Sequence, residues 1–332
     1  MRRLAVFVEE ETGRRFLRPV VVEQEGDESF RRRLLEEFRE DEQDLRTDGR
    51  LLQALGMIPP GTDVVEALRD LLGFGVVGFY DPESDELVVR GERDTPFVRS
   101  TIVHELVHAL DDQWFDLDRS ELDDLPDESA FGLSAVAEGH ARTIEERWKR
   151  TLSPSERARL ELEELSMPVP PEVFDVPPIL VRLVLAPYEL GERFVSEVAS
   201  EPKCGVEDAF AVPPDTSAEV IDPQLWIDGF EPLKVPKPEA EGRVVDEGVF
   251  GELMLGYLLE GVTSQPREVA SGWAGDWYVA WERGGETCVR IDFATDGSPR
   301  TLTAALGSWA DQHPDATVQP RPGGLVRLTA CG

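Results

Sequence analysis

The sequence predicts a mostly helical α+β protein. Apolar residues recur at intervals of three and four positions over several long segments, which is typical of amphipathic helices. Two pairs of short β-rich runs are separated by turn residues, which predicts two hairpins. Hydrophobic residues make up 41% of the 332 positions, which is enough for a large buried core. This length corresponds to roughly two domains.

The first predicted elements are two helices and a hairpin. Phenylalanine and leucine recur along one face between residues 28 and 46, which predicts the first helix. Thr62, after a Pro-Pro-Gly turn, is expected to cap the second helix. Residues 75–80 and 86–90 are β-rich and are expected to pair around the turn at residues 81–85.

A longer helix is expected next. Thr95 followed by Pro96 is typical of a helix start, and the helix should run to about Gln113. Farther on, Ser153 and Glu156 have the spacing of a capping box. After an acidic loop at 111–128, the expected helices span residues 129–150, 153–165 and 179–198.

The last third of the chain differs in character. Residues 201–240 are rich in Pro, Asp and Glu and predict a loop or linker. Residues 1–200 are expected to form the main core, and residues 241–332 a small α+β subdomain. The expected elements of this subdomain are a helix at 250–259, a hairpin of 276–282 and 286–293 turned by Gly284-Gly285, a helix at 300–311 and a strand at 325–330.

Charge excludes several classes of partner. The chain has 67 acidic and 34 basic residues, for a formal net charge of −33. Such a chain repels the phosphate backbone, so we expect no general nucleic-acid binding. The same charge argues against docking on anionic lipid. No run of 18 apolar residues exists, so we expect no membrane span.

The first residues and the cysteines bear on the compartment. The apolar run Leu4–Val8 is too short for a secretory leader. The chain as given therefore predicts a cytoplasmic protein, whereas a truncated start would allow an extracytoplasmic one. If the strands of Cys288 and Cys331 share one sheet, these two residues can form a disulfide, which would indicate an oxidising compartment. Cys204 is expected to be free.

One motif carries chemistry. His104, Glu105 and His108 form H-E-x-x-H inside the helix expected after Thr95. The i, i+4 spacing places both imidazoles on one face, where they can share a metal ion. Glu105 would then lie beside the ion, where it can accept a proton from a bound water and later deliver it. With only four histidines in the chain, chance predicts this motif in well under ~1% of shuffled sequences.

A catalytic zinc site needs a third protein ligand and an open position. A metzincin would have histidine at position 114, but that residue is Trp114. Glu138, in the middle of a later helix and among small residues, is the best candidate. Small neighbours allow two helices to approach closely enough for the carboxylate to reach the metal. The alternative for Glu138 is a salt bridge with Arg142.

Three nearby residues are weaker candidates. Asp112 shares the face of the two histidines and could orient an imidazole from outside the metal shell, or be an exposed acid. Tyr188 could donate to an oxyanion, or be a packed aromatic. His140 lies about 200° around its helix from Glu138, so we expect it to point away from the metal.

A run of aspartates follows the motif. Aspartates supply the oxygen ligands that calcium prefers, but this run lacks the spacing and the glycine of an EF-hand. We therefore expect solvated charge here rather than a calcium site. The aspartates are Asp111, Asp112, Asp116, Asp118, Asp123, Asp124 and Asp127.

These motifs resemble the gluzincin zinc metallopeptidases. The closer likeness is to a group of bacterial metallopeptidases with H-E-x-x-H-A-L-x-D-Q, here residues 104–113, and a later A-x-x-E-G-D-A helix, here 135–141. The likeness extends to residues 78–82, 186–188 and 272–276. His140 departs from it, since the family usually has aspartate there. The resemblance implies a zincin-like core, an edge strand that holds extended substrate, and frequent export.

We therefore expect one zinc ion per chain and a peptide or protein substrate. One alternative is a non-catalytic metal-binding or interaction protein on the same fold. The intact Glu105 argues against it, because a metal holder needs no acid at that position. A zinc hydrolase of non-peptide bonds, such as esters or epoxides, is the other alternative, and the sequence does not separate it from a peptidase.

Overall fold

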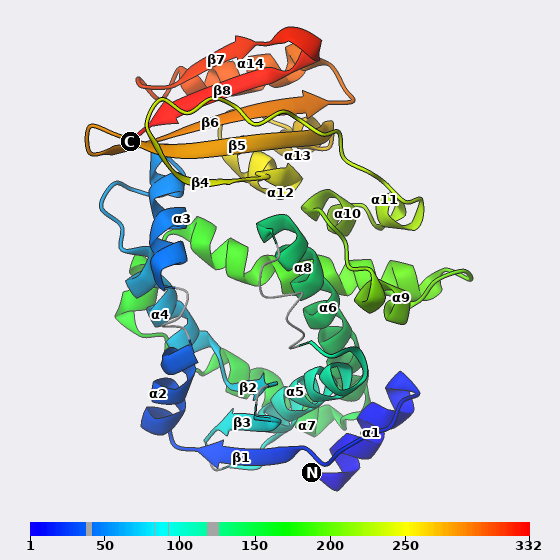
Figure 1. Ribbon diagram of the computed structural model, residues 1–332. Helices are drawn as coiled ribbons and strands as arrows, with labels where there is room; N and C mark the ends of the chain where they lie inside the picture. Colours follow the sequence, from blue (N-terminus) through cyan, green and yellow to red (C-terminus); the bar gives the residue numbers. More distant parts are fainter. Residues whose placement is uncertain (38–41, 83, 92, 118–125) are drawn as a thin grey trace.

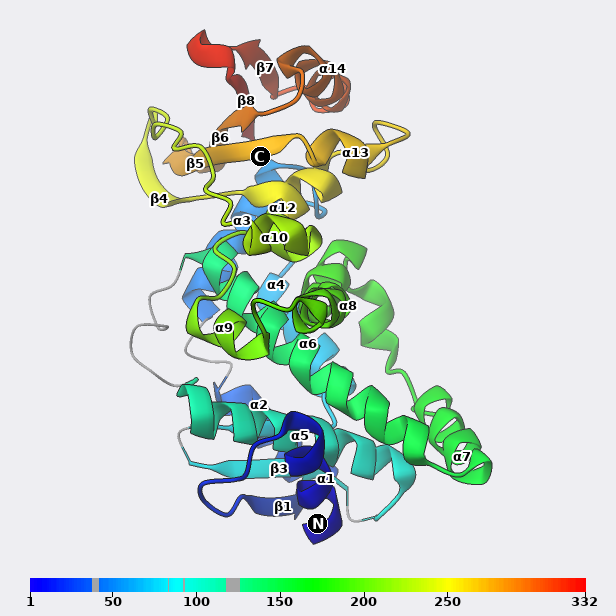
Figure 2. The same ribbon diagram turned by 90° about the vertical axis from the view of Figure 1, so that its right-hand side faces the viewer.

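The computed structural model describes residues 1–37, 42–82, 84–91, 93–117 and 126–332. About 55% of the chain is helical and 16% is strand, which confirms the mostly helical α+β class. A three-stranded sheet lies at one end of the molecule, a five-stranded sheet at the other, and long helices between them (Figures 1 and 2). The N-terminus lies near the smaller sheet and the C-terminus near the larger one.

The smaller sheet confirms the first predicted hairpin. Strands β2 (Gly78–Asp81) and β3 (Glu86–Arg90) are antiparallel. β1 (Val21–Glu25), which the sequence did not predict, adds to β3 in parallel. The strand order is β1-β3-β2, so β2 is an edge strand within the described part of the chain.

Helical structure is confirmed in two described segments of the helix expected over 28–46. The structure has α2 (Asp27–Glu37) and α3 (Glu42–Ala54), and residues 38–41 lie outside the described part. The two helices serve different cores. Phe30 of α2 packs against Phe79 of β2, whereas α3 buries its leucines beneath the larger sheet. The first residues of the chain form an additional helix, α1 (Arg2–Thr12), which the sequence did not predict.

The cap of the second expected helix is also corrected. Helix α4 (Val64–Gly75) is capped by Asp63, whose side chain accepts from the backbone N–H groups of Val65 and Glu66. The hydroxyl of Thr62 instead donates to the carbonyl of Pro59 at 2.8 Å. A carboxylate is favoured over a hydroxyl here because it also interacts with the positive end of the helix dipole.

Helix α5 (Pro96–Phe115) is buried along most of its length. Thr95 caps it and accepts from the N–H of Val98, as expected. The helix continues two residues past Gln113, so the acidic loop is shorter than expected. Asp111 and Asp112 belong to α5, and residues 118–125 of that loop lie outside the described part.

Two long helices cross beside α5. They are α6 (Asp127–Thr151) and α8 (Pro178–Ser200). A Cβ on Gly139 would come within 2.2 Å of the Gly191 backbone, and one on Gly191 within 2.0 Å of the carbonyl oxygen of Ala135. Only glycine permits this approach. In the sequence, α6 and α8 are connected through α7 (Pro154–Leu165), which has the expected capping box at Ser153, and the 3₁₀ turn η2 (Pro171–Asp175).

Residues 201–240 contain more structure than a loop. They form three short helices, α9 (Val206–Ala211), α10 (Ser217–Ile221) and α11 (Pro223–Ile227). After them the chain runs along the larger sheet, where the N–H of Leu233 donates to the carbonyl of Ala274 at 2.7 Å.

The larger sheet is antiparallel, with the order β4-β5-β6-β8-β7. Cys288 and Cys331 face each other on β6 and β8 and form a disulfide, which the sequence left open, and Cys204 is free, as expected. The elements of this part are β4 (Arg243–Gly248), α12 (Gly251–Leu258), α13 (Pro266–Ala270), β5 (Trp273–Arg283), β6 (Glu286–Thr295), α14 (Pro299–Ala310), β7 (Thr317–Pro320), η3 (Pro322–Gly324) and β8 (Val326–Cys331).

One core joins the early and late parts of the chain. Its early members are Leu51 of α3, Leu55 directly after α3, and Leu68 of α4. They belong to the same buried cluster as Ile291 and Leu328 of the larger sheet. The early helices therefore hold the larger sheet against the rest of the molecule. None of the helices described here is long and apolar enough to cross a membrane.

Candidate metal centre

Three side chains from two helices converge at one point. On α5, the Nε2 atoms of His104 and His108 lie 3.0 Å and 3.4 Å from Oε2 of Glu138 on α6. The two imidazole centroids are 4.8 Å apart. All three ligand atoms lie within 4.8 Å of one another. The structure thus brings together the three expected ligands in a group that could hold one metal ion.

The helix crossing explains how Glu138 reaches the histidines. Its neighbour Gly139 contacts the backbone of Gly191, so the small residues bring α6 against α8. Glu138 itself faces α5. Its alternative partner, Arg142, lies instead 3.7 Å from Glu192 on α8.

Glu145 is a contributor that the sequence analysis missed. Its Oε2 lies 3.3 Å from Nδ1 of His104, on the other side of the ring from Glu138. The carboxylate also accepts from the hydroxyl of Ser100 and pairs with Lys149. A carboxylate at this position fixes the orientation of a ligating imidazole and makes it a better donor. The available signal was spacing, because Glu145 lies seven residues after Glu138 on the same helical face.

Comparison with known proteins adds no family. No family model, no curated protein and no solved structure matches the chain. The interpretation of the site therefore rests on its own residues.

The charges of the cluster fit a divalent cation. Burial acts to lower the pKa of His104, but hydrogen bonds with Glu138 and Glu145 outweigh it and raise the pKa to about 10. Burial also opposes the charge of His108, yet Glu138 raises its pKa. The carboxylates around the two imidazoles thus favour positive charge at this position, and a divalent cation can supply that charge in place of protons.

Glu105 lies beside this cluster and is 7% exposed. Burial raises the pKa of its carboxyl group, and the nearby histidines oppose that effect. Among the described residues its carboxylate has no hydrogen-bond partner. A buried carboxylate with free acceptor atoms, next to a metal position, is suited to exchange protons with a water or a substrate.

Tyr188 on α8 covers the same cluster. Its ring stacks on that of His104 with centroids 6.1 Å apart. Burial raises the pKa of its hydroxyl, and the charges of Glu138 and Glu105 raise it further. The hydroxyl therefore stays protonated and can donate a hydrogen bond at neutral pH.

Asp112 is buried but binds elsewhere. It accepts hydrogen bonds from the hydroxyl of Tyr80 at 2.9 Å and from the N–H of Leu117 at 3.1 Å, and it pairs with Arg18 at 3.2 Å. Asp112 is therefore not an exposed acid, one of the two alternatives that the sequence allowed. Its bond with Tyr80 ties the edge strand β2 to α5. Asp112 thereby holds a strand beside the cluster.

His140 points away from the metal ligands, as expected. Its Nδ1 lies 2.7 Å from Oδ2 of Asp111. In the aspartate run, Asp111 and Asp112 thus have partners within the protein, and Asp118, Asp123 and Asp124 lie outside the described residues. Among the described residues, the group of His104, His108 and Glu138 is the cluster that could hold a metal ion.

Two cavities meet at the cluster. One is about 440 Å³ and the other about 400 Å³, and both are lined by Gly78, His104, Glu105 and Tyr188. The first extends toward α4 and α8 and the second toward residues 79–82 and α6. Together they form a cleft that follows the edge strand β2 past the metal position.

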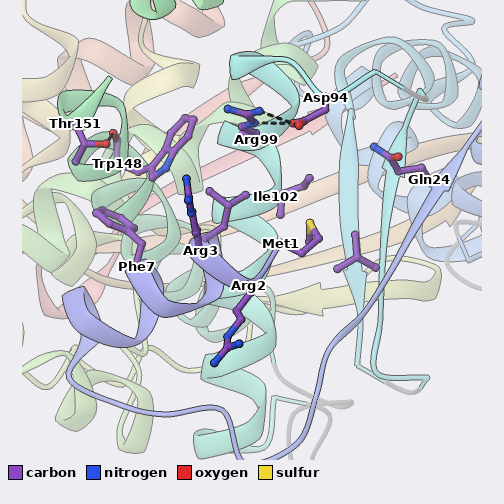
Figure 3. Close-up of a pocket in the computed structure, with 12 residues that line it drawn as sticks. Met1, Arg2, Arg3, Phe7, Gln24, Asp94, Arg99, Ile102, Trp148 and Thr151 are labelled. Atoms are coloured by element: carbon purple, nitrogen blue, oxygen red, sulfur yellow. Dashed lines mark hydrogen bonds and ion pairs between the residues drawn. The ribbon is translucent and has the colours of Figure 1, made fainter. Parts of the chain in front are cut away.

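A larger cavity lies apart from this cleft. It has a volume of about 770 Å³ and is lined by α1 and by parts of α5 and α6, including Arg3, Phe7 and Trp148 (Figure 3). Arg99, also on its wall, pairs with Asp94. No residue of the metal cluster lines it, so size alone does not indicate the site of chemistry.

Proposed function

We propose that this protein is a zinc-dependent hydrolase that cleaves peptide bonds. The observation that carries the proposal is the convergence of His104, His108 and Glu138 beside the carboxylate of Glu105, which has no hydrogen-bond partner among the described residues. Two imidazole nitrogens and one carboxylate are a usual donor set for catalytic zinc, with a fourth position left for water or substrate. Bound there, zinc would act as a Lewis acid toward a carbonyl and lower the pKa of a water.

The surrounding side chains supply the proton transfers and the orientation. Glu105 accepts a proton from the attacking water and returns it to the leaving amine. Tyr188 donates a hydrogen bond to the oxygen that gains charge at the scissile carbonyl. Glu145 keeps the ring of His104 in place. These roles need one acid, one neutral donor and one orienting carboxylate, and the cluster offers all three.

The edge strand favours an extended peptide as substrate. Within the described part of the chain β2 pairs with β3 alone, and residues of β2 line the cleft. Backbone N–H and C=O groups on a free strand edge bind an extended chain by strand addition. The bonds of Asp112 to Tyr80 keep this strand in place against α5. An ester or epoxide would make no use of such an edge.

A cleavage assay tests the proposal. Zinc-loaded protein is incubated with casein and with a peptide library, with and without a chelator, and with Glu105→Gln as the inactive control. Peptide cleavage that the chelator and the variant both abolish supports a peptidase. Hydrolysis of esters without peptides would indicate a non-peptide hydrolase, and bound zinc without any hydrolysis would indicate a metal-binding protein.

A further inference from the structure

We propose that the 770 Å³ cavity beside α1 binds an amphiphilic carboxylate of the fatty-acid type. This proposal does not depend on the proposed hydrolysis, because His104, His108 and Glu138 do not line the cavity. The cavity volume lies within the range of about 300–1,000 Å³ that is usual for small-molecule sites. Its wall combines an apolar floor with an arginine at the rim, and these two features together favour a ligand with an apolar chain and an anionic head group.

The floor of the cavity is apolar and comes from three elements. Leu4 of α1 and Ile102 of α5 are 8% and 3% exposed, and the half-buried Val22 of β1 also lines the cavity. All three belong to or pack against one hydrophobic core cluster. An aliphatic chain that lies on this floor removes its own apolar surface from water, which favours binding.

The charged part of the wall favours an anion. Among the described residues, three arginines and one aspartate line the cavity, although the chain as a whole has 67 acidic and 34 basic residues. Arg99 is paired with Asp94 through two hydrogen bonds, at 2.6 Å and 2.8 Å. Arg3, in contrast, has no acidic partner within the ranges that the structure describes. Its guanidinium group is therefore available to an anionic ligand.

The side chain of Arg3 enters the cavity from its rim. Arg3 is exposed, whereas Trp148 on the cavity wall is 6% exposed. Figure 3 shows Arg3 directed toward Trp148, with Ile102 beside it, whereas Arg2 points away from the other labelled residues. A guanidinium group forms two parallel hydrogen bonds with a carboxylate. A carboxylate at the rim therefore binds Arg3 while its chain lies on the apolar floor.

The net charge of −33 does not exclude such a ligand. At physiological salt, interactions between exposed charges are largely screened beyond about 8 Å. The arginine beside the ligand therefore acts on it more strongly than distant carboxylates do. An anionic membrane surface differs, because it would approach many carboxylates of the chain at once. The cavity thus favours a single amphiphilic anion over an anionic bilayer.

The first test compares ligands that share one chain and differ in the head group. The purified protein is titrated by isothermal titration calorimetry with decanoate, decanol and decyltrimethylammonium, each below its micelle concentration. We expect decanoate to bind at one site per chain, about tenfold or more tightly than the other two. Equal binding of decanoate and decanol would overturn the proposal, because the head group would then not be recognised.

A chain-length series tests the apolar floor. Each methylene group that leaves water for an apolar site should strengthen binding about fourfold. The affinity should therefore rise by about this factor per methylene group from hexanoate through octanoate to decanoate. An affinity that does not change with chain length would overturn the proposal, because the ligand would then be held by its charge alone.

Two variants with the same change in charge locate the site. Arg3→Gln removes the guanidinium group at the rim, so its affinity for decanoate should fall about tenfold while its affinity for decanol stays the same. Arg321→Gln makes the same change directly after β7 of the larger sheet, at the other end of the molecule, and should bind decanoate like the wild type. Equal melting temperatures show that both variants fold. Unchanged decanoate binding in Arg3→Gln would overturn the proposal, since the anion would then bind elsewhere.

Discussion

The carboxylate of Glu145 lies 3.3 Å from Nδ1 of His104, on the side of the ring that faces away from Glu138. His104 is therefore held between two carboxylates of one helix, and its orientation does not depend on the metal. Lys149 and Ser100 hold Glu145 in turn. The ligand set is thus prepared before an ion binds, which reduces the cost of ordering on binding.

The first prediction concerns this orienting contact. Glu145→Gln removes the charge that supports the imidazole, and zinc affinity should fall about 10-fold or more. Competition with a chromophoric chelator measures it. Glu146→Gln is the matched control, because Glu146 bonds to the same Lys149 but not to a histidine. Equal affinities in the two variants would contradict the assigned role.

The third ligand is tested by Glu138→Ala. Metal analysis of the purified wild-type protein should give close to one zinc per chain, and the variant should retain only a small part of it, because two imidazoles alone bind weakly at an open site. Glu161→Ala, an exposed acid on α7, controls for the loss of one charge. Full retention of zinc in the Glu138 variant would place the third ligand elsewhere.

The role of Glu105 predicts a separation of metal binding from hydrolysis. Glu105→Gln preserves the shape of the side chain but cannot accept the proton of the water. The variant should hold zinc like the wild type and lose on the order of 10²–10⁴ in rate. Metal analysis and peptide cleavage are measured on the same preparation. Unchanged hydrolysis would refute the mechanism.

The local signals predicted the site better than the long-range ones. His104, Glu105 and His108 lie on one helix whose cap, Thr95, was also predicted, so spacing alone placed them. Glu138 needed only one further helix among small residues. Glu145 was missed because its contact with His104 depends on how α5 and α6 cross, and the spacing of one helix does not reveal that crossing.

Tertiary packing decided the elements that the sequence did not predict. Each residue of β1 pairs with a residue of β3 that lies 65 positions later in the chain, and an edge strand with a half-exposed pattern carries little periodic signal. Within the segment expected at 28–46, Phe30 packs against Phe79, whereas the leucines of α3 enter the core beneath the larger sheet, and periodicity does not reveal that difference. The short helices at 206–227 follow local caps such as Thr216, which the Pro-rich composition concealed.

A buried acid away from the metal predicts a pH dependence of stability. Glu128 accepts from the N–H and the hydroxyl of Ser217. Burial raises its pKa from 4.5 to about 8, and the nearby Asp276 and Asp127 add to this. Between these two values the folded chain binds more protons than the unfolded one, so the free energy of unfolding falls as pH rises through this window, by at most about 1.4 kcal/mol per pH unit.

Glu128→Gln should remove this contribution, because the amide oxygen still accepts both bonds and carries no charge. Chemical denaturation at several pH values should show a variant that gains stability relative to the wild type as pH rises to about 8. Glu161→Gln on the surface of α7 should follow the wild-type curve. Parallel curves for wild type and Glu128→Gln would show that Glu128 does not titrate in this range.

The final prediction concerns the cysteines. The Cys288–Cys331 disulfide closes a separation of 43 residues and ties the last strand, β8, to β6. A crosslink of this span restricts the unfolded chain and is expected to stabilise the fold by roughly 4 kcal/mol. Replacement of both cysteines by serine should lower the free energy of unfolding by about that amount, measured by denaturant titration, whereas Cys204→Ser should have little effect. Thiol counting in denaturant should find one reactive thiol, that of Cys204, before reduction and three after it. Three reactive thiols before reduction would show that the purified chain lacks the bridge. A single reactive thiol is expected of a chain that folds in an oxidising compartment.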